Sequence, residues 1–278
     1  MKIMKYNIIM LDVIQKGALA GGEVLLKYFR QEQLEITNKT THQNIVTKAD
    51  IESQKIIHDS IITDLGKKGI DVVDIGFIGE EKLHAKGEHT FVIDPLDGTS
   101  NFATGVEDFC VLIGYLHNKT LQSGVMYFPT YNKWYIAEKD KGAYVIKNGV
   151  KTRLKTKHKN LKDTFLVSSL SYTEEVRLGL PGKIIALKNH FRGVRMYGCA
   201  GTEIYLVAEN IGGAALLAGC SIWDIAPGKL ILDESGFGMY DFSGKEIVFD
   251  LENPTKKYPF IACDPQFKEE LTKALSAS

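Results

Sequence analysis

The 278-residue sequence predicts a layered α/β fold, in which an N-terminal sheet-and-helix half packs on a C-terminal α/β half to form one unit. Three observations support this prediction. Two stretches with helical periodicity come first, a series of short apolar runs separated by turns follows, and helical and strand-like patterns then alternate. The sequence contains no internal repeat and no low-complexity tract, so neither a solenoid nor a disordered tail is expected.

The first two predicted elements are helices. Apolar residues recur at helical spacing from Asp12 to Phe29, which predicts an amphipathic helix. Residues 32–44 are rich in Thr, Asn, Gln and Lys and predict a polar loop, after which residues 45–50 open a second helix that continues to Ile62. On this interpretation, two helices precede the first strand.

The following segments predict an antiparallel sheet and then a second half. The expected strands of the sheet cover residues 75–78, 90–93, 109–116, 121–128 and 133–138. A basic, polar segment at 147–162 comes next, and we place there the boundary between an N-terminal half, 1–148, and a C-terminal half, 149–278. Beyond the boundary, the predicted elements are a strand at 164–168 and helices at 201–210 and 226–234.

Composition and charge narrow the possible functions. Lysine plus arginine and aspartate plus glutamate each total 34, so the formal net charge is zero and a nucleic-acid polymer is not an expected partner. The N-terminal apolar stretch is interrupted by Asp12, Gln15 and Lys16, which fits neither a signal peptide nor a membrane span, so we expect a soluble, cytoplasmic protein. The four cysteines have no paired spacing and are expected to be buried hydrophobic residues, so oxygen atoms should hold any metal.

The most informative segment, Asp94–Thr99, follows the strand predicted at 90–93. Acidic residues at a strand end can point into a cleft, and Pro95 keeps Asp94 extended. Its carboxylate can therefore converge with that of Asp97, while the Leu96 carbonyl can also face inward. Such a set of oxygen donors is typical of a magnesium site.

The residues after these acids suit an anion. Gly98 lets the backbone approach a ligand, and a helix starting near Thr99 would direct its amides at a phosphate. An ordinary turn with a helix cap is the alternative. Two further acids favour the metal site: Glu80 follows another apolar run, and Asp224 lies before a C-terminal helix, where it could also be an N-cap with Pro227 in the first turn.

These motifs together resemble the inositol monophosphatase family, a group of lithium-sensitive, magnesium-dependent sugar phosphatases. The most specific agreements are Gly79-Glu80-Glu81, residues 94–99 with Asn101-Phe102, and Trp223-Asp224, in that order. Weaker agreements are residues 46–50, residues 137–144 and Gly201-Thr202. The resemblance covers nearly the whole chain. It implies an αβαβα sandwich with the metals in the groove between the halves, and a homodimer.

The resemblance also implies roles for individual residues. Up to three magnesium ions would be held by Glu80, Asp94, the Leu96 carbonyl, Asp97 and Asp224, with Asp97 bridging. Thr99 and Asp50 would form a hydrogen-bonded pair that, with Glu80, orients and deprotonates a magnesium-activated water. Lys39 would either lie near the third metal or be a solvated loop lysine. The substrate-binding residues would be Asp97, Gly98, Thr99, Glu203 and Asp224.

The alcohol part of the substrate is less determined. Where animal inositol monophosphatases carry a glutamate that contacts inositol hydroxyls, this chain has Leu217. Glu203 follows Gly201-Thr202 where those enzymes have alanine, and it either supplies the missing contact or faces solvent or pairs within its helix. We expect a phosphomonoesterase acting on inositol monophosphate or a related sugar or polyol phosphate. Histidinol phosphate, fructose 1,6-bisphosphate and nucleotide 3′-phosphates are alternatives, the nucleotides ranking lower.

Two rival functions have distinct signatures. A haloacid-dehalogenase-type phosphatase uses the first aspartate of DxDGT as a covalent nucleophile, but here Pro95 and Leu96 separate the two acids. A non-catalytic protein that binds metal or a phosphorylated metabolite could keep the same fold. All the expected ligands and the Asp50 and Thr99 pair are present, which favours an enzyme.

Overall fold

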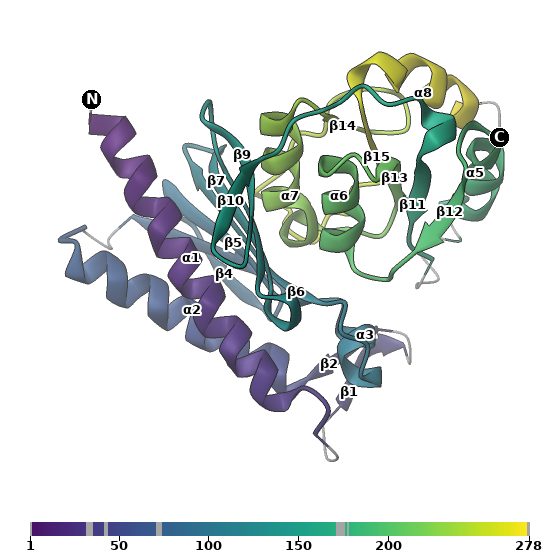
Figure 1. The fold of residues 1–278 in the computed structure, drawn as a ribbon. Coiled ribbons are helices and arrows are strands. Elements are labelled where there is room, and N and C mark those ends of the chain that lie inside the picture. Colours follow the sequence, from purple (N-terminus) through teal and green to yellow (C-terminus); the bar gives the residue numbers. More distant parts are fainter. Residues whose placement is uncertain are drawn as a thin grey trace.

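The computed structural model describes residues 2–31, 36–41, 44–70, 74–170, 176 and 178–276, and it has the predicted layered α/β fold (Figure 1). In this described part, three pairs of helices alternate with two large sheets to give an αβαβα sandwich. The helix pairs, from one outer face to the other, are α1 (Lys2–Tyr28) with α2 (Lys48–Lys67), α6 (Ala200–Ala208) with α7 (Ile222–Ser235), and α5 (Leu180–Leu187) with α8 (Lys268–Ser276).

The first sheet is mostly antiparallel, as expected. Its eight described strands have the order β10-β9-β8-β7-β6-β5-β3-β4, and β3 with β5 is the parallel pair. The strands are β3 (Ile75–Gly79), β4 (Leu83–Ala85), β5 (His89–Asp97), β6 (Cys110–His117), β7 (Thr120–Phe128), β8 (Lys133–Glu138), β9 (Gly142–Lys147) and β10 (Val150–Arg153). Most of them follow one another in the chain, so short turns suffice to connect them.

The second sheet is mixed. Among the described residues it has five strands in the order β12-β11-β13-β15-β14, in which β11 runs parallel to both of its neighbours and the remaining pairs are antiparallel. The strands are β11 (Phe165–Ser168), β12 (Gly193–Met196), β13 (Gly212–Leu217), β14 (Gly238–Tyr240) and β15 (Phe260–Cys263). A short hairpin, β1 (Ile36–Thr41) and β2 (Asn44–Thr47), and the six-residue helix α3 (Thr99–Thr104) lie beside one end of the first sheet.

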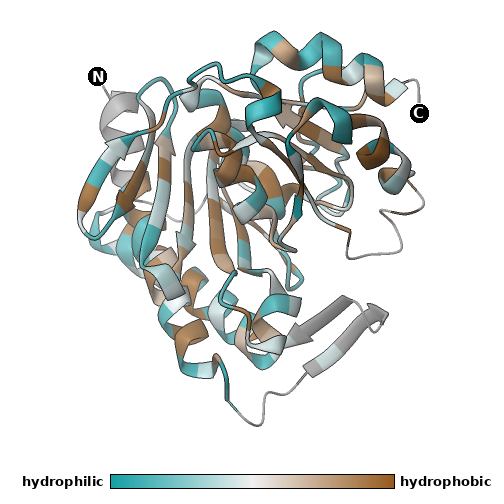
Figure 2. Cartoon of the chain, turned by 45° about the vertical axis from the view of Figure 1, so that its right-hand side comes forward, coloured by the Kyte–Doolittle hydropathy of each residue, from teal (hydrophilic) through white to brown (hydrophobic). Residues whose placement is uncertain are grey.

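The core fills the spaces between the layers. Strand β6 shows the arrangement, because Val111 and Ile113 pack toward α1 and α2 whereas Leu112 and Leu116 pack toward α7. A strand that is covered on both faces reads as a continuous apolar run, which is why this segment was recognisable in the sequence. Figure 2 shows hydrophobic residues concentrated in the strands and on the inner sides of the helices.

Close packing of α7 on the first sheet requires a small residue. A Cβ atom built on Gly124 of β7 would lie 3.0 Å from both the Cα and the carbonyl oxygen of Pro227 in α7. Pro227 has no amide hydrogen, so this turn of α7 lacks one backbone hydrogen bond. Because Gly124 has no side chain, the backbone of α7, the helix that carries Asp224, packs directly against the backbone of β7.

The structure corrects several predicted element boundaries. Residues 44–47 form β2 instead of the start of the second helix, and the hairpin of β1 and β2 therefore lies between the first two helices. Strand β5 continues to Asp97, and α7 begins at Ile222 instead of Ala226. Strand β10 falls inside the polar segment in which we placed the boundary between the halves, and that boundary stays a prediction.

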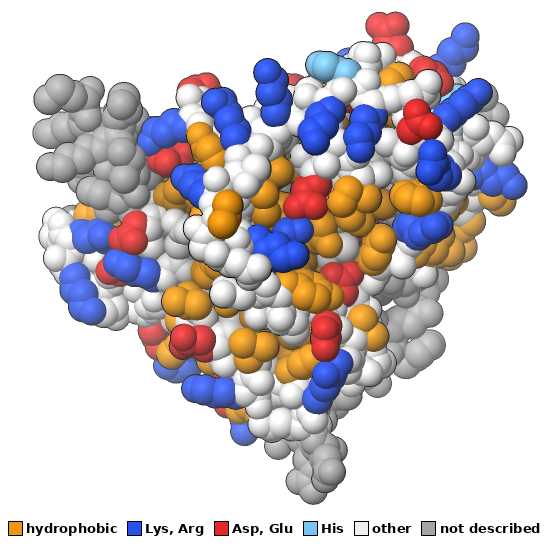
Figure 3. All heavy atoms as spheres, in the orientation of Figure 1, with side chains coloured by type: hydrophobic (Ala, Val, Ile, Leu, Met, Phe, Trp, Pro, Cys, Tyr) orange, Lys and Arg blue, Asp and Glu red, His pale blue; other side chains and the backbone are white. Residues whose placement is uncertain are grey.

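None of the helices in the described ranges combines the length and the apolar character needed to cross a bilayer. Positive and negative side chains are interspersed over the face shown in Figure 3, in keeping with totals of 34 for each sign.

Candidate active site

The predicted ligands and phosphate-binding residues line one pocket at the C-terminal end of β5. Its walls come from the turn after β3, the end of β5, the first turn of α3 and the start of α7, and its volume is about 100 Å³. The predicted residues in this lining are Glu80, Asp94, Leu96, Asp97, Gly98, Thr99 and Asp224. Because these segments are far apart in the sequence, the tertiary fold assembles the pocket.

A bulge in β5 directs two carboxylates to the same side. Asp94 lies opposite Leu112 of β6 and Asp97 lies opposite Cys110, so β5 has one residue more than β6 between these pairs. Side chains three residues apart on a regular strand point to opposite faces, and the extra residue removes this difference. Pro95, which has no amide to donate to the ladder, lies within the bulge.

Two of the other acids occupy equivalent positions at helix starts. Asp50 is the third residue of α2, and its Oδ2 accepts a hydrogen bond from the amide of Thr47 at 2.8 Å. Asp224 is the third residue of α7, and its Oδ2 accepts from the amide of Ser221 at 2.5 Å. Both are capping boxes, which fix one oxygen of the carboxylate. Asp224 is therefore not itself an N-cap, which was the alternative interpretation.

Asp50 contacts Thr99 as expected. The Thr99 hydroxyl lies 3.2 Å from Asp50 Oδ1 and 3.0 Å from the Leu96 carbonyl oxygen, so its single proton can be donated to either acceptor. Burial raises the pKa of Asp50 to about 7, although hydrogen bonds from Thr47 oppose part of this increase and the charge of Glu80 adds to it. A carboxyl group with this pKa can gain or lose a proton near neutral pH.

Asp94 is the centre of the acidic cluster. Burial raises its pKa well above the usual range, and the charges of Glu80, Asp224 and Asp97 raise it further. Burial likewise raises the pKa of Asp224 to about 7, while the ammonium group of Lys257 opposes this increase. Carboxylates crowded in this way are stabilised by a bound cation, and a donor set made only of oxygen fits magnesium.

Asp97 is oriented by the start of α6 and by two thiols. Its Oδ1 accepts from the Ala200 amide at 3.0 Å, and its Oδ2 accepts from the Gly201 amide at 2.6 Å. The thiol of Cys199 lies 3.1 Å from Oδ2, and that of Cys110 lies 3.5 Å from it. Burial raises the pKa of Cys199 to about 12, so this thiol is protonated and donates. All four cysteines are buried, as expected, and these two also hold Asp97.

Two positioning residues escaped the sequence analysis. The side-chain amide of Gln54 donates to the Glu81 carbonyl oxygen at 3.0 Å and accepts from the Glu81 amide at 2.9 Å, so it holds the turn that carries Glu80. Its position four residues after Asp50, on the same helix face, is a signal that could have identified it. Lys257 donates to Ser221 Oγ at 2.8 Å, and no local motif marks it.

The structure does not place Glu203 in the lining of this pocket. Glu203 is fully buried, and its Oε1 accepts hydrogen bonds from the Tyr197 and Gly198 amides at 3.3 Å each. It therefore does not face solvent, and these bonds hold the loop before α6. Gly198, Ala200 and Leu217 line the pocket there. The side chain of Lys39 lies outside the described residues.

Comparisons with known proteins identify relatives with this fold. A model of the inositol monophosphatase family matches residues 10–278. Inositol monophosphatase 1 of Bos taurus is 32% identical over 240 residues, which cover 81% of this chain and 82% of the relative. A Thermotoga maritima protein named fructose-1,6-bisphosphatase/inositol-1-monophosphatase is 30% identical over 227 residues, which cover 81% of this chain and 82% of that protein.

Among solved structures, the extragenic suppressor protein SuhB of Bartonella henselae superposes with a TM-score of 0.82 at 25% identity. The superposition covers 96% of this chain and 98% of that chain, so the two share all five layers. The family match includes every residue that lines the pocket. The chain therefore belongs to the inositol monophosphatase family, a family of metal-dependent phosphomonoesterases.

Proposed function

We propose that this protein hydrolyses a small phosphate monoester, either inositol monophosphate or a related sugar or polyol phosphate, with magnesium as cofactor. The observation that carries the proposal is the pocket at the end of β5, which combines buried oxygen donors with a Thr99 hydroxyl that contacts Asp50 at 3.2 Å. Such a pocket offers a place for cations, for a phosphate group and for a proton. We infer that its occupant is a phosphate ester and not a nucleic-acid polymer.

The cations would be held by residues already named. Up to three magnesium ions would bind to Glu80, Asp94, the Leu96 carbonyl, Asp97 and Asp224. Bound magnesium would polarise the phosphoryl group, lower the pKa of the attacking water and stabilise the leaving oxygen. Asp94 Oδ1 accepts a hydrogen bond from the Leu96 amide at 3.0 Å and both oxygens of Asp97 accept from α6 amides, so each carboxylate would be oriented before a cation binds.

Thr99 and Asp50 would accept the proton of the attacking water. When Asp50 is ionised, the Thr99 hydroxyl donates to Asp50 Oδ1, which leaves its oxygen lone pairs to accept from the water. Asp50 is held for this role by Thr47, which donates to its other oxygen at 2.8 Å. Glu80, on the turn held by Gln54, would orient the same water.

The phosphate group would be bound by the backbone at the start of α3. Gly98 has a φ of +86°, a left-handed conformation that favours glycine, and Thr99 begins the helix directly after it. The amides of both residues would stabilise charge that develops on the phosphoryl oxygens. A Cβ atom on Gly98 would lie 2.9 Å from the Asp108 carbonyl oxygen, so a larger residue is doubly unfavourable.

The pocket wall limits the alcohol part of the substrate. Leu217 and Ala200 offer no hydroxyl contact, whereas Ser169 and Asn101 line the same pocket and can hydrogen-bond to a polyol. Inositol 1-phosphate and fructose 1,6-bisphosphate lead the candidates, because two relatives, at 30% and 32% identity, carry names for such activities. Histidinol phosphate and nucleotide 3′-phosphates follow.

A phosphate-release screen tests the proposal. We expect release from at least one sugar or polyol phosphate with Mg²⁺, loss of release with a chelator, and inhibition by Li⁺. An Asp94→Asn variant should be inactive with every ester. Binding of phosphate esters without any release would instead favour a non-catalytic protein, and a trapped phosphoaspartate at Asp94 or Asp97 would favour the covalent mechanism. A homodimer and a cytoplasmic location remain part of the proposal.

A further inference from the structure

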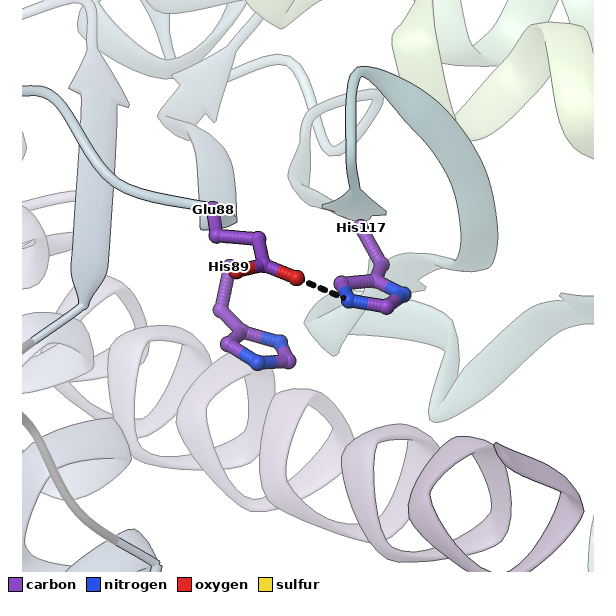
Figure 4. A group of neighbouring side chains, drawn as sticks. All are labelled: Glu88, His89 and His117. Atoms are coloured by element: carbon purple, nitrogen blue, oxygen red, sulfur yellow. Dashed lines mark hydrogen bonds and ion pairs between the residues drawn. The ribbon is translucent and has the colours of Figure 1, made fainter. Parts of the chain in front are cut away.

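A second group of potential metal ligands lies at the opposite end of β5. His89 is the first residue of β5 and His117 is the last residue of β6, and the two are direct partners in the antiparallel register. Directly opposed residues carry their side chains on the same face of the sheet. Glu88 precedes His89, and Figure 4 shows its carboxylate directed at the His117 ring with the His89 ring alongside.

The contacts within this group place ligand atoms close together. Glu88 Oε1 lies 2.8 Å from His117 Nε2, and the two imidazole rings stack with a centroid distance of 4.7 Å and an interplanar angle of 8°. One ligand atom from each of the three residues lies within 4.8 Å of the others. Zinc–nitrogen and zinc–oxygen bonds of about 2.0–2.2 Å bring ligand atoms closer together than this, so the two stacked rings would rotate until one nitrogen of each ring points at the same ion.

The environment of His89 favours metal binding in two ways. The Tyr115 hydroxyl lies 2.7 Å from His89 Nδ1, and a hydrogen bond to one ring nitrogen orients the other for a metal. Burial lowers the pKa of His89, and the neighbouring His117 lowers it further, so the neutral ring that binds metals is favoured. Glu88 supplies a negative charge next to both rings.

We propose that Glu88, His89 and His117 bind a divalent transition-metal ion, of which Zn²⁺ is the representative, with water completing the coordination. Two imidazoles and one carboxylate are nitrogen-rich ligands that suit Zn²⁺, Ni²⁺, Cu²⁺ or Co²⁺ and not Mg²⁺. Binding exchanges the hydrogen bond between Glu88 and His117 for two metal bonds. A neutral His117 ring then carries its proton on Nδ1, whereas a protonated ring releases one proton to solvent.

This site would be separate from the active-site pocket. Asp94 follows His89 by five residue steps along an extended strand, which corresponds to about 16 Å. The metal would join the first residue of β5 to the last residue of β6, and its expected effect is on stability. Activity with Mg²⁺ should not depend on it.

Titration of the full-length protein with Zn²⁺, in excess Mg²⁺ that occupies the oxygen-rich pocket, tests the proposal. Calorimetry should detect one Zn²⁺ equivalent that His117→Ala loses and that Glu88→Gln binds about tenfold or more weakly. Zn²⁺ should raise the midpoint of thermal unfolding of the original protein and not that of His117→Ala. Phosphate release with Mg²⁺ should be the same in all three proteins.

His84→Ala is the matched control, because His84 lies on β4 of the same sheet, is exposed, and is absent from the group. It should retain the Zn²⁺ equivalent and the stabilisation. Equal Zn²⁺ stoichiometry and affinity in the original protein, His117→Ala and Glu88→Gln would overturn the proposal. Glu88→Gln keeps the test valid if the histidine variant folds poorly, since the Glu88 side chain is 44% exposed and the change preserves its size.

Discussion

Thr99 shows how much of the proposed chemistry depends on one hydroxyl group. It lies between Asp50 Oδ1 and the Leu96 carbonyl, and it also begins the helix that would hold the phosphate. A residue with no hydroxyl at this position would keep the backbone amides that would bind phosphate, but it could not pass a proton from the water to Asp50. Such a change should therefore lower turnover much more than it weakens substrate binding.

We expect Thr99→Ala to lower kcat by about 10²–10³-fold with a much smaller change in KM, because the backbone amides that would bind phosphate remain. Thr99→Ser, which keeps the hydroxyl, should recover most of the activity. Steady-state kinetics with the best substrate of the phosphate screen measure both effects. A Thr99→Ala enzyme within threefold of the original would exclude this role for the hydroxyl.

Substitution of Asp94 and of Asp97 by asparagine should have opposite effects on the stability of the metal-free protein. Either substitution by asparagine should abolish turnover through loss of a metal ligand. Asp94→Asn removes a buried charge from a cluster of like charges, so it should raise the thermal midpoint of metal-free protein. Asp97→Asn places an amide group among the amide donors of α6, so it should lower that midpoint.

Differential scanning fluorimetry in chelator, at pH 7.5, distinguishes the two variants. Near-normal turnover of Asp97→Asn would contradict the metal assignment, and equal shifts in midpoint would contradict the different roles of the two carboxylates.

At the scale of elements, α6 depends on a glycine that lets it approach β6. A Cβ atom on Gly201 would lie 2.6 Å from Cys110 Sγ and 3.2 Å from Asp97 Oδ2. We expect Gly201→Ala to lower the free energy of unfolding by about 1–3 kcal/mol and to reduce activity by displacing Asp97. Chemical denaturation and phosphate release measure these effects.

Gly182→Ala in α5 is the matched control. No heavy atom lies within 4 Å of a Cβ atom built there, and alanine is the better helix former, so the protein should become slightly more stable. If Gly201→Ala also stabilised the protein and left activity unchanged, the close packing of α6 on β6 would not matter for the site.

The whole molecule carries a pH dependence that comes from its buried acids. Asp50 and Asp224 have a pKa of about 7 in the folded protein against an ordinary value of 3.8. Between these values the folded chain binds more protons than the unfolded chain, so its free energy of unfolding decreases as pH rises from about 4 to 7. The pKa of Asp12 is lowered in the folded protein, so this residue changes the free energy of unfolding only below its ordinary pKa of 3.8.

We therefore expect metal-free protein to have a lower thermal midpoint at pH 8 than at pH 5.5, and Mg²⁺ to raise the midpoint more at pH 8. Asp224→Asn should show a smaller decrease, because one of the titrating groups is gone. Scanning calorimetry with chelator and with Mg²⁺ measures these differences. A midpoint that rises with pH in chelator, equally in both proteins, would refute the assignment.

Prediction from sequence succeeded where the pattern is local. The apolar runs of the first sheet, the helix start at Thr99, the acid after β3 and the acids at the end of β5 were all visible, because each depends on neighbours in the chain. Residues 44–47 were misassigned because Thr47 caps α2 while it still pairs with β1, and only the hairpin partner reveals the strand. Strand β10 is polar and exposed, so it carried no apolar signal.

The sequence by itself determined the fold family and the acids that should share a pocket. Only the tertiary structure decided how each acid is held: Asp97 by the α6 amides and two thiols, the Glu80 turn by Gln54, and Asp224 near Lys257. It also showed that Glu203 accepts a hydrogen bond from the loop before α6 and does not line the pocket. The reason is physical, because burial and hydrogen bonds between distant segments depend on packing that no local sequence pattern specifies.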